Sequence, residues 1–107
     1  MSRKRILIIQ GHPDAKGGHL CHALAQAYAD GAAEGEHDVW RIDVAQLDFP
    51  LLRSATDWNQ NTLPTCLVPA QQGIEWAQHL VVFFPLWLGD MPALLKAFFE
   101  QTLRPGF

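Results

Sequence analysis

The run Ile6-Leu7-Ile8-Ile9 constrains the fold more than any other feature of this sequence. It lies within the segment Arg5–Gln10 and stops at Gly11. A continuous apolar run of this length, rich in β-branched residues, is typical of a strand buried on both faces, as in parallel sheets that helices cover on both sides. The run therefore predicts a first strand in a parallel sheet.

The segment that follows, up to Asp43, contains one predicted helix and one predicted strand. A helix is predicted from Leu20, because apolar residues there are spaced for one face and glycines follow as stop signals: Leu20, Leu24, Ala27 and Tyr28, then Gly31 and Gly35. The segment 37–43 alternates polar with apolar residues, which predicts a shorter, less buried strand.

The second half of the chain repeats this order after an irregular stretch. Residues 45–64 are rich in Pro, Asn, Asp and Thr, and so long a connection is expected to be functional or to carry short helical pieces. A helix is predicted over 69–79, an apolar strand over 80–84, and an amphipathic helix over 92–103 with Pro92 in its first turn. The resulting β-α-β-α-β-α order predicts a doubly wound α/β fold with a parallel sheet and right-handed crossovers.

Composition limits the class of protein and its partners. The 107 residues are 49% hydrophobic and 18% charged, values typical of one soluble globular domain. The formal net charge of −3 leaves no basic stripe for a phosphate backbone, so no nucleic-acid partner is expected. No window approaches the roughly 18 apolar residues of a membrane span, and the first apolar run is too short for a signal peptide.

Cysteine usage points to a reducing compartment. Cys21 and Cys66 are too few for a disulfide framework and lack metal-ligand spacing. We therefore expect reduced thiols and a cytoplasmic location. No metal site is expected either, because the five histidines are scattered along the sequence; His22 and His79, expected inside helices, are interpreted as solvated polar residues.

Two loops are the candidate binding elements, since ligands of doubly wound sheets bind beyond the carboxyl ends of the strands. The first is 10–21, where glycines and the mouth of a helix could cradle a phosphate. It matches neither GxxxxGK[ST] nor GxGxxG, so a flexible glycine loop is an equal alternative. Asp14, which follows Pro13, is interpreted as a turn residue rather than a cap of the phosphate loop.

The second candidate loop is 85–92, between the last predicted strand and helix. Its apolar residues Leu86, Trp87 and Leu88 and its backbone N–H groups suit a flat heteroaromatic ring that needs both stacking and donors. The alternative is that Trp87 and Leu88 pack in the core or at a subunit interface, and both interpretations can hold together.

Three runs of the sequence carry a resemblance to a known family: 6–14, the stretch from 42–43 to 47–50, and above all 84–87 through 91–96. There the chain resembles the flavodoxin-like NAD(P)H dehydrogenase (quinone) family, of the DT-diaphorase, modulator of drug activity B and potassium-efflux ancillary protein type. The resemblance covers essentially the whole chain. It implies that 1–107 is the N-terminal part of a single flavodoxin-like domain, with the first three βα units of a sheet of order 2-1-3-4-5.

The resemblance also implies which residues hold a flavin, FAD or FMN. His12 matches a histidine on the phosphate side of the flavin. His19, Leu20 and Cys21 fall on the family's Ser-Phe-Asn type positions at the helix mouth, which hold the phosphate, and Gly18 just before them is a further candidate. Because His19 and Cys21 replace a hydroxyl and an amide, phosphate binding would depend on backbone N–H groups and on His19 when protonated. The main chain of Pro85, Leu86, Trp87 and Leu88 would run beside the isoalloxazine ring.

The activity implied is two-electron, ping-pong hydride transfer from NAD(P)H through the bound flavin to a quinone or similar acceptor, in a homodimer. The family's Thr-Gly-Gly type flavin loop and its proton-handling Tyr/His pair have no counterpart before Phe107, so no catalytic residue is assigned. The rival hypothesis is a truncated, catalytically incomplete fragment or interaction module that binds no flavin. An electron shuttle of the flavodoxin kind is disfavoured, since the loop lacks its Ser/Thr-rich character.

Four structural expectations follow. The loops 11–21 and 85–91 should lie together at the carboxyl end of the sheet and form one cleft. The face with Trp87, Leu88, Met91 and the last helix should be unusually exposed, as a face that a second subunit covers. Trp87 should be only partly enclosed, and the strand over 80–84 should form an apolar sheet edge.

Overall fold

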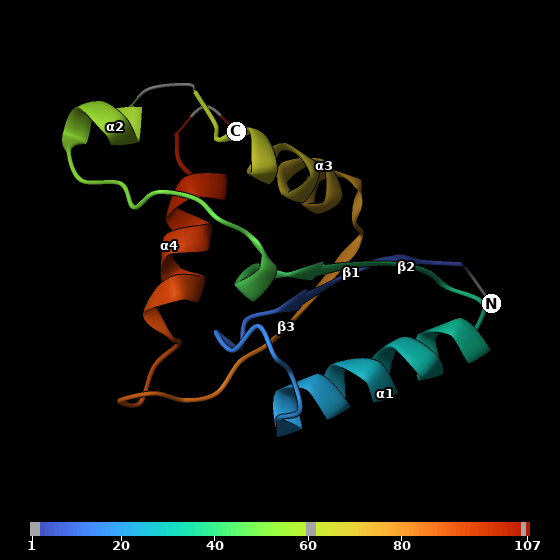
Figure 1. The fold of residues 1–107 in the computed structure, drawn as a ribbon. Coiled ribbons are helices and arrows are strands. Elements are labelled where there is room, and N and C mark those ends of the chain that lie inside the picture. Colours follow the sequence, from blue (N-terminus) through green and yellow to red (C-terminus); the bar gives the residue numbers. More distant parts are fainter. Residues whose placement is uncertain (1–2, 60–61, 106) are drawn as a thin grey trace.

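The computed structural model describes residues 3–59, 62–105 and 107, and places one sheet between two layers of helices (Figure 1). The strands are β1 (Arg5–Gln10), β2 (Asp38–Asp43) and β3 (His79–Phe83). The helices are α1 (Leu20–Glu34), α2 (Ala55–Asn59), α3 (Val68–Trp76) and α4 (Ala93–Thr102), with short 3-10 turns η1 (Val44–Gln46) and η2 (Thr65–Leu67). α1 covers one face of the sheet, and α3 and α4 cover the other.

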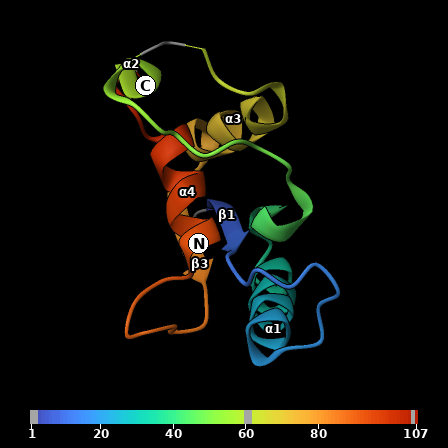
Figure 2. The ribbon, with the colours of Figure 1, turned by 60° about the vertical axis from the view of Figure 1, so that its left-hand side comes forward.

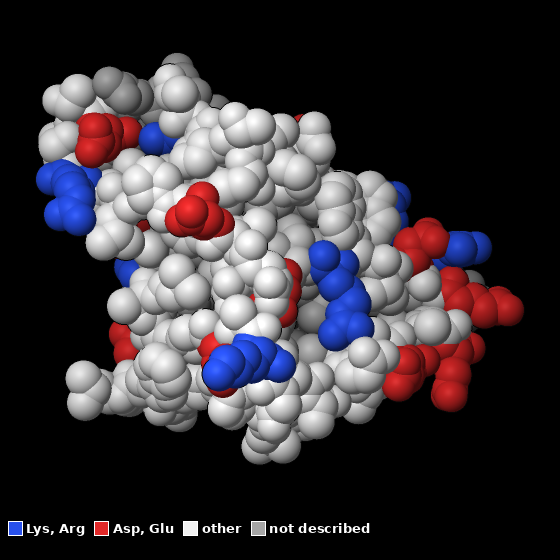
Figure 3. All heavy atoms as spheres, in the orientation of Figure 1, with Lys and Arg blue, Asp and Glu red and all other residues white. Residues whose placement is uncertain are grey.

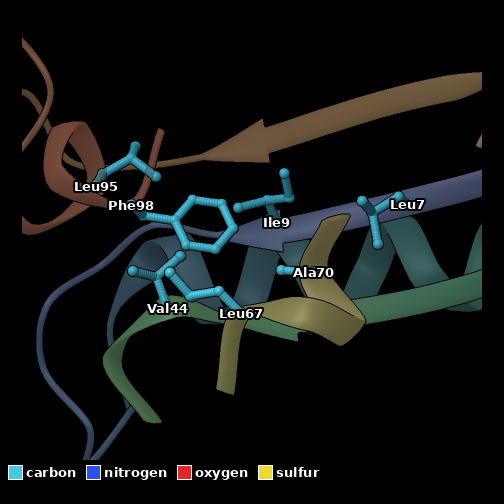
Figure 4. Packing of buried hydrophobic residues seen from close by; sticks show 7 residues of the cluster. All are labelled: Leu7, Ile9, Val44, Leu67, Ala70, Leu95 and Phe98. Carbon is cyan, nitrogen blue, oxygen red and sulfur yellow. The ribbon is translucent and has the colours of Figure 1, made fainter. Parts of the chain in front are cut away.

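The strand order is β2-β1-β3 and both pairings are parallel, as the doubly wound prediction requires. β1 is buried along almost its whole length, whereas β2 is only half-buried, and both results confirm the sequence patterns. The side chains of β1 alternate between two apolar clusters. Leu7 and Ile9 join the larger cluster beneath α3 and α4 (Figure 4), and Ile6 and Ile8 join the smaller one beneath α1.

The face of α1 that packs on the sheet differs from the prediction. Ala25 and Ala32 are its buried residues, while Leu20 and Leu24 are 73% and 47% exposed. Of the predicted stripe, Tyr28 packs against the cluster under α1. Alanines let the helix approach the strands closely, so the larger side chains point away from the sheet. α1 continues through Gly31 and ends before Gly35, the second predicted stop.

The helix predicted over 69–79 ends earlier, at Trp76. The reason is competition from β1: the backbone N–H of Gln78 donates to the carbonyl of Arg5, and the Gln78 side chain accepts from the Arg5 N–H. His79, expected in a helix, is therefore the first residue of β3, paired with Ile6. β3 starts one residue before the prediction and forms a sheet edge, with Leu80 44% exposed.

The connection between β2 and α3 carries the short helical pieces η1, α2 and η2, as expected. Two nearly buried polar side chains, at and just after the end of α4, hold this connection in place. Gln101 donates to the carbonyl of Pro50, and Arg104 donates to the carbonyls of Asp57 and Thr62. No helix in the described ranges is long and apolar enough to cross a bilayer, and both cysteines are free thiols.

Gly11 allows the end of β1 to meet α4 and β3. A Cβ at this position would lie 2.6 Å from Cδ2 of the buried Leu95 and 3.1 Å from the carbonyl oxygen of Phe83. The Gly11 N–H donates to that same carbonyl at 2.7 Å. The close approach therefore leaves no room for a side chain.

We predict that Gly11→Ala lowers the free energy of unfolding by about 1–3 kcal/mol, the usual cost of overpacking a core. Gly31→Ala is the matched control, because a Cβ at Gly31 within α1 meets nothing within 4 Å. This control should raise stability by about 0.5–1 kcal/mol, since alanine favours helix over glycine. Urea unfolding of both variants checks the pair, and equal effects would contradict the close-contact interpretation.

Candidate functional site

The two candidate loops leave the same edge of the sheet. The loop after β1 and the loop between β3 and α4 both follow strands that run parallel, so both begin at the carboxyl end (Figure 2). They meet through an edge-to-face contact between the rings of His12 and Trp87, whose centroids lie 5.9 Å apart. This confirms that the loops are neighbours; that they form one cleft stays a prediction.

Gln10 organises the first loop. This residue is 5% exposed, and its side chain donates to the carbonyl of Cys21 at 2.9 Å and accepts from the N–H of His12. It thereby ties the end of β1 to the first turn of α1. Gln46 fixes the outer part of the loop by donating to the carbonyl of Ala15. Neither glutamine was predicted as a site residue from the sequence, although a polar residue at the end of a buried apolar strand was an available signal for Gln10.

His12 is nearly enclosed, with 7% of its surface exposed. Its Nδ1 accepts the backbone N–H of Asp14 at 3.0 Å, so in the neutral ring the proton lies on Nε2. Burial lowers the pKa of His12, and the neighbouring His19 and His22 lower it further. His12 is thus a neutral donor at physiological pH rather than a cation.

Three imidazoles converge on this loop. The rings of His12 and His19 stack with centroids 4.0 Å apart, and His22 lies 5.3 Å from His12 and 5.6 Å from His19. The interpretation of His22 as a separate, solvated residue was therefore wrong, because the first turn of α1 brings it back to the loop. Across the described ranges, no three His, Cys, Asp or Glu side chains are arranged to hold a metal ion.

Asp14 is a turn residue, as expected. Its carboxylate accepts the N–H of Lys16, two residues further on, and also pairs with Nε2 of His19 at 2.8 Å. The hydrogen bond from His19 lowers the pKa of Asp14. This pair offsets part of the positive charge that a protonated His19 would offer to an anion.

The mouth of α1 is open. His19 occupies the position before the helix, and the first turn, which Leu20 and Cys21 begin, has no acidic residue. Gly17 and Gly18 adopt left-handed backbone conformations with φ of +76° and +82°, and a Cβ on Gly18 would meet nothing within 4 Å. Backbone N–H groups at a helix start together with free space suit an anion.

The second loop is a tight turn. Trp87 and Asp90 exchange backbone hydrogen bonds, and the residues between them, Leu88 and Gly89, have φ of +52° and +75°. Positive φ suits Gly89 but is uncommon for leucine. The N–H groups of Trp87 and Asp90 already donate hydrogen bonds within this turn. Any N–H donors to a bound ring would therefore come from other residues of the loop.

Exposure at this loop follows the prediction only in part. Leu86, Trp87 and Leu88 are 73%, 51% and 107% exposed, whereas Pro85 is half-buried. The corner of the molecule where this loop lies is mostly white in Figure 3, although the loop also carries the exposed Asp90. A hollow of about 450 Å³ lies beside it, lined by the loop and by the start of α4. Met91 and α4 were expected to be exposed, but Met91 packs on the core and α4 buries Leu95 and Phe98.

Comparison with known proteins identifies the family. A family model described as "Flavodoxin-like fold" matches residues 4–107. The chain belongs to this flavodoxin-like family. Its family membership agrees with the three parallel strands and flanking helices described above.

Named relatives are oxidoreductases. The chain is 28% identical to the ribosyldihydronicotinamide dehydrogenase-like protein traD of Penicillium crustosum, covering 96% of this chain and 45% of the relative. It is also 28% identical to the uncharacterized NAD(P)H oxidoreductase YcaK of Escherichia coli K12, and that match covers 99% of this chain and 56% of the relative. An NAD(P)H:quinone oxidoreductase from Methanothermobacter marburgensis shares the fold with a TM-score of 0.81 at 23% identity, covering 99% and 56%. The flavodoxin-like chain thus spans about half the length of these proteins.

The lowered pKa of His12 predicts a pH dependence of stability. The folded chain disfavours the protonated ring, so just below the ordinary pKa of 6.5 the unfolded chain binds more protons and stability rises with pH. The contribution of the neutral His12 ring to stability is therefore complete above pH 6.5, and it is lost as the pH falls below 6.5 and the ring becomes protonated. Urea unfolding at about pH 5.5 and about pH 7.5, on either side of the ordinary histidine pKa, should show a smaller loss on acidification for His12→Gln than for the unsubstituted chain. Equal losses would contradict the role of His12.

Proposed function

We propose that this chain is the N-terminal part of a flavin-dependent NAD(P)H:quinone-type oxidoreductase, and that its two loops hold the flavin. The single observation that carries the proposal is the contact of His12 with Trp87, because it joins an anion-binding helix mouth to an exposed aromatic loop. A flavin nucleotide needs both, since it combines a phosphate with a flat apolar ring. The oxidoreductase names of the relatives point to the same reaction class.

The residues present fit such a group. The open space at Gly18 and the acid-free first turn of α1 would receive the phosphate, with His12, His19 and the backbone of Leu20 and Cys21 around it. The ring would lie along the Pro85–Leu88 backbone beside Trp87. Flavins supply two-electron transfer between a nicotinamide donor and an acceptor such as a quinone. In the proposed site, the described residues of this chain would bind and orient the flavin.

The exposed apolar turn supports a homodimer. Leu88 is fully exposed at the tip of the turn in a backbone conformation that disfavours leucine, so its side chain contributes little to the folding of this chain. Exposed apolar groups grouped in one loop are typical of a surface that a second subunit covers. In the proposed assembly, Leu86 and Leu88 contact the partner and help to close the flavin site.

The proposal predicts that the protein retains FAD or FMN after reconstitution. In analytical ultracentrifugation, flavin absorbance should sediment with the protein at twice the mass of one chain. Anaerobic addition of NADH or NADPH should lower that absorbance, and a quinone should restore it. A protein that sediments without flavin at every concentration tested supports instead the incomplete fragment or interaction module.

Substitution of Trp87 separates ligand binding from packing. Trp87 is half exposed, so Trp87→Ala should cost the flavin-free protein less than the about 3–5 kcal/mol of a buried aromatic residue. Flavin binding should weaken by about 1–3 kcal/mol, by analogy with base stacking on aromatic side chains. Trp40, which packs on the core and against Trp76, provides the control: Trp40→Ala should mainly lower stability. Thermal unfolding and flavin titration of both variants test this, and a large stability loss with unchanged affinity would make Trp87 a packing residue.

A further inference from the structure

We infer that His22 is a phosphate-binding residue, whose buried Nε2–H donates a hydrogen bond to a phosphate oxyanion at the glycine turn of the first loop. The inference rests on the proposed function, since it takes this anion to be the phosphate of a flavin nucleotide. Neither the sequence patterns nor the family resemblance assigned His22 to the site.

The backbone fixes the protonation of this ring. Nδ1 of His22 accepts the N–H of His19 at 3.2 Å, from the residue that precedes α1. A nitrogen that accepts a hydrogen bond carries no proton, so in the neutral ring the proton lies on Nε2. The arrangement resembles a capping box, in which the third helical residue bonds back to the N–H before the helix. His22 is thereby held with a donor on its far side.

That donor has no acceptor within the described residues. Nε2 of His22 is buried and forms no hydrogen bond there. It lies under the glycine turn, because a Cβ on Gly17 would be 4.0 Å from this atom. An unpaired buried donor is costly, and such exceptions call for a specific explanation, among them an acceptor supplied by a ligand. A phosphate seated on the open turn at Gly18 would supply that acceptor.

A second buried ring points to the same place. His12 has nine-tenths of its surface buried and, in the described chain, uses only Nδ1 for hydrogen bonding, which leaves its Nε2–H for a ligand. The charged or titratable groups around the cluster are Asp14 and Lys16 on the loop, His19 before α1, and Asp43 on β2. The Nε2–H groups of His12 and His22 would therefore donate to the phosphate in place of the hydroxyl and amide side chains that this loop lacks.

The direct test is NMR of the His22 imidazole. Titration with FMN should shift the Nε2–H signal of His22 and slow its exchange with water, whereas riboflavin, which lacks the phosphate, should leave the signal unchanged. The titration is repeated with FAD and with inorganic phosphate. FAD tests a pyrophosphate as the source of the oxyanion, FMN tests a monophosphate, and inorganic phosphate tests a free anion. A merely structural role for His22 would not produce a phosphate-dependent response.

Substitutions provide the affinity test. His22→Leu removes the donor and should weaken FMN binding about tenfold or more, as for the loss of one hydrogen bond to a charged group, with riboflavin binding unchanged. His22→Gln keeps both an acceptor for the His19 N–H and an amide donor, and should recover most of the affinity. His37→Leu is the matched control, because Nδ1 of His37 also accepts a backbone N–H, that of Lys4, away from the loop. Circular dichroism checks that all three variants keep their helices.

Two results would overturn the inference without touching the proposed function: equal FMN affinity in His22→Leu, or an equal loss for FMN and riboflavin. If the unsubstituted protein binds neither FMN nor FAD, the proposed function fails instead. The response of the His22 signal to inorganic phosphate then decides the inference by itself. A phosphate-dependent shift supports it, and an unchanged signal overturns it.

Discussion

The close packing of Gly11 against Leu95 and the Phe83 carbonyl is the contact on which the rest of the structure depends. It brings the end of β1 to β3 and α4, so the chain leaves both strands at nearly the same point. Because His12 follows Gly11 directly, this contact also sets how far the histidine lies from Trp87. The central strand and the candidate site are therefore linked by one backbone position, and a side chain there would disturb both.

Much of the fold could be predicted because burial leaves a strong pattern in sequence. The β1 run is typical of a strand covered on both faces, and the stripe of α4 contains the buried Leu95 and Phe98. The errors occurred where a tertiary contact outweighed local preference. Residues 77–79 continue the helical pattern of α3, but two hydrogen bonds between Gln78 and Arg5 compete with that pattern, and His79 begins β3. The packing face of α1 was missed because alanine gives little periodic signal.

The site was less predictable, because its organisation depends on hydrogen bonds between residues far apart in sequence or on one helical turn. The sequence predicted that the loops after β1 and β3 lie together at one edge of the sheet, and they do. It could not show that Gln10 joins both ends of the first loop, or that the first turn of α1 returns His22 to within 5.3 Å of His12. Three histidines at irregular spacing match no motif, yet the glycine turn and the helix start bring their rings together.

The two edges of the sheet differ in how strongly they oppose pairing with a further strand. β2 carries charged residues, and its first residue, Asp38, pairs with Arg3. Charges on an edge strand oppose pairing with a further strand. β3 has no Asp, Glu, Lys or Arg and exposes Leu80, so further pairing is least opposed there. Strands added on that side would extend the order β2-β1-β3 outward from β3, on the side where the Trp87 turn and α4 begin. The exposed Trp87 turn would then lie between the added strands and the start of α1. A flat ring at the turn could be contacted from both of these sides.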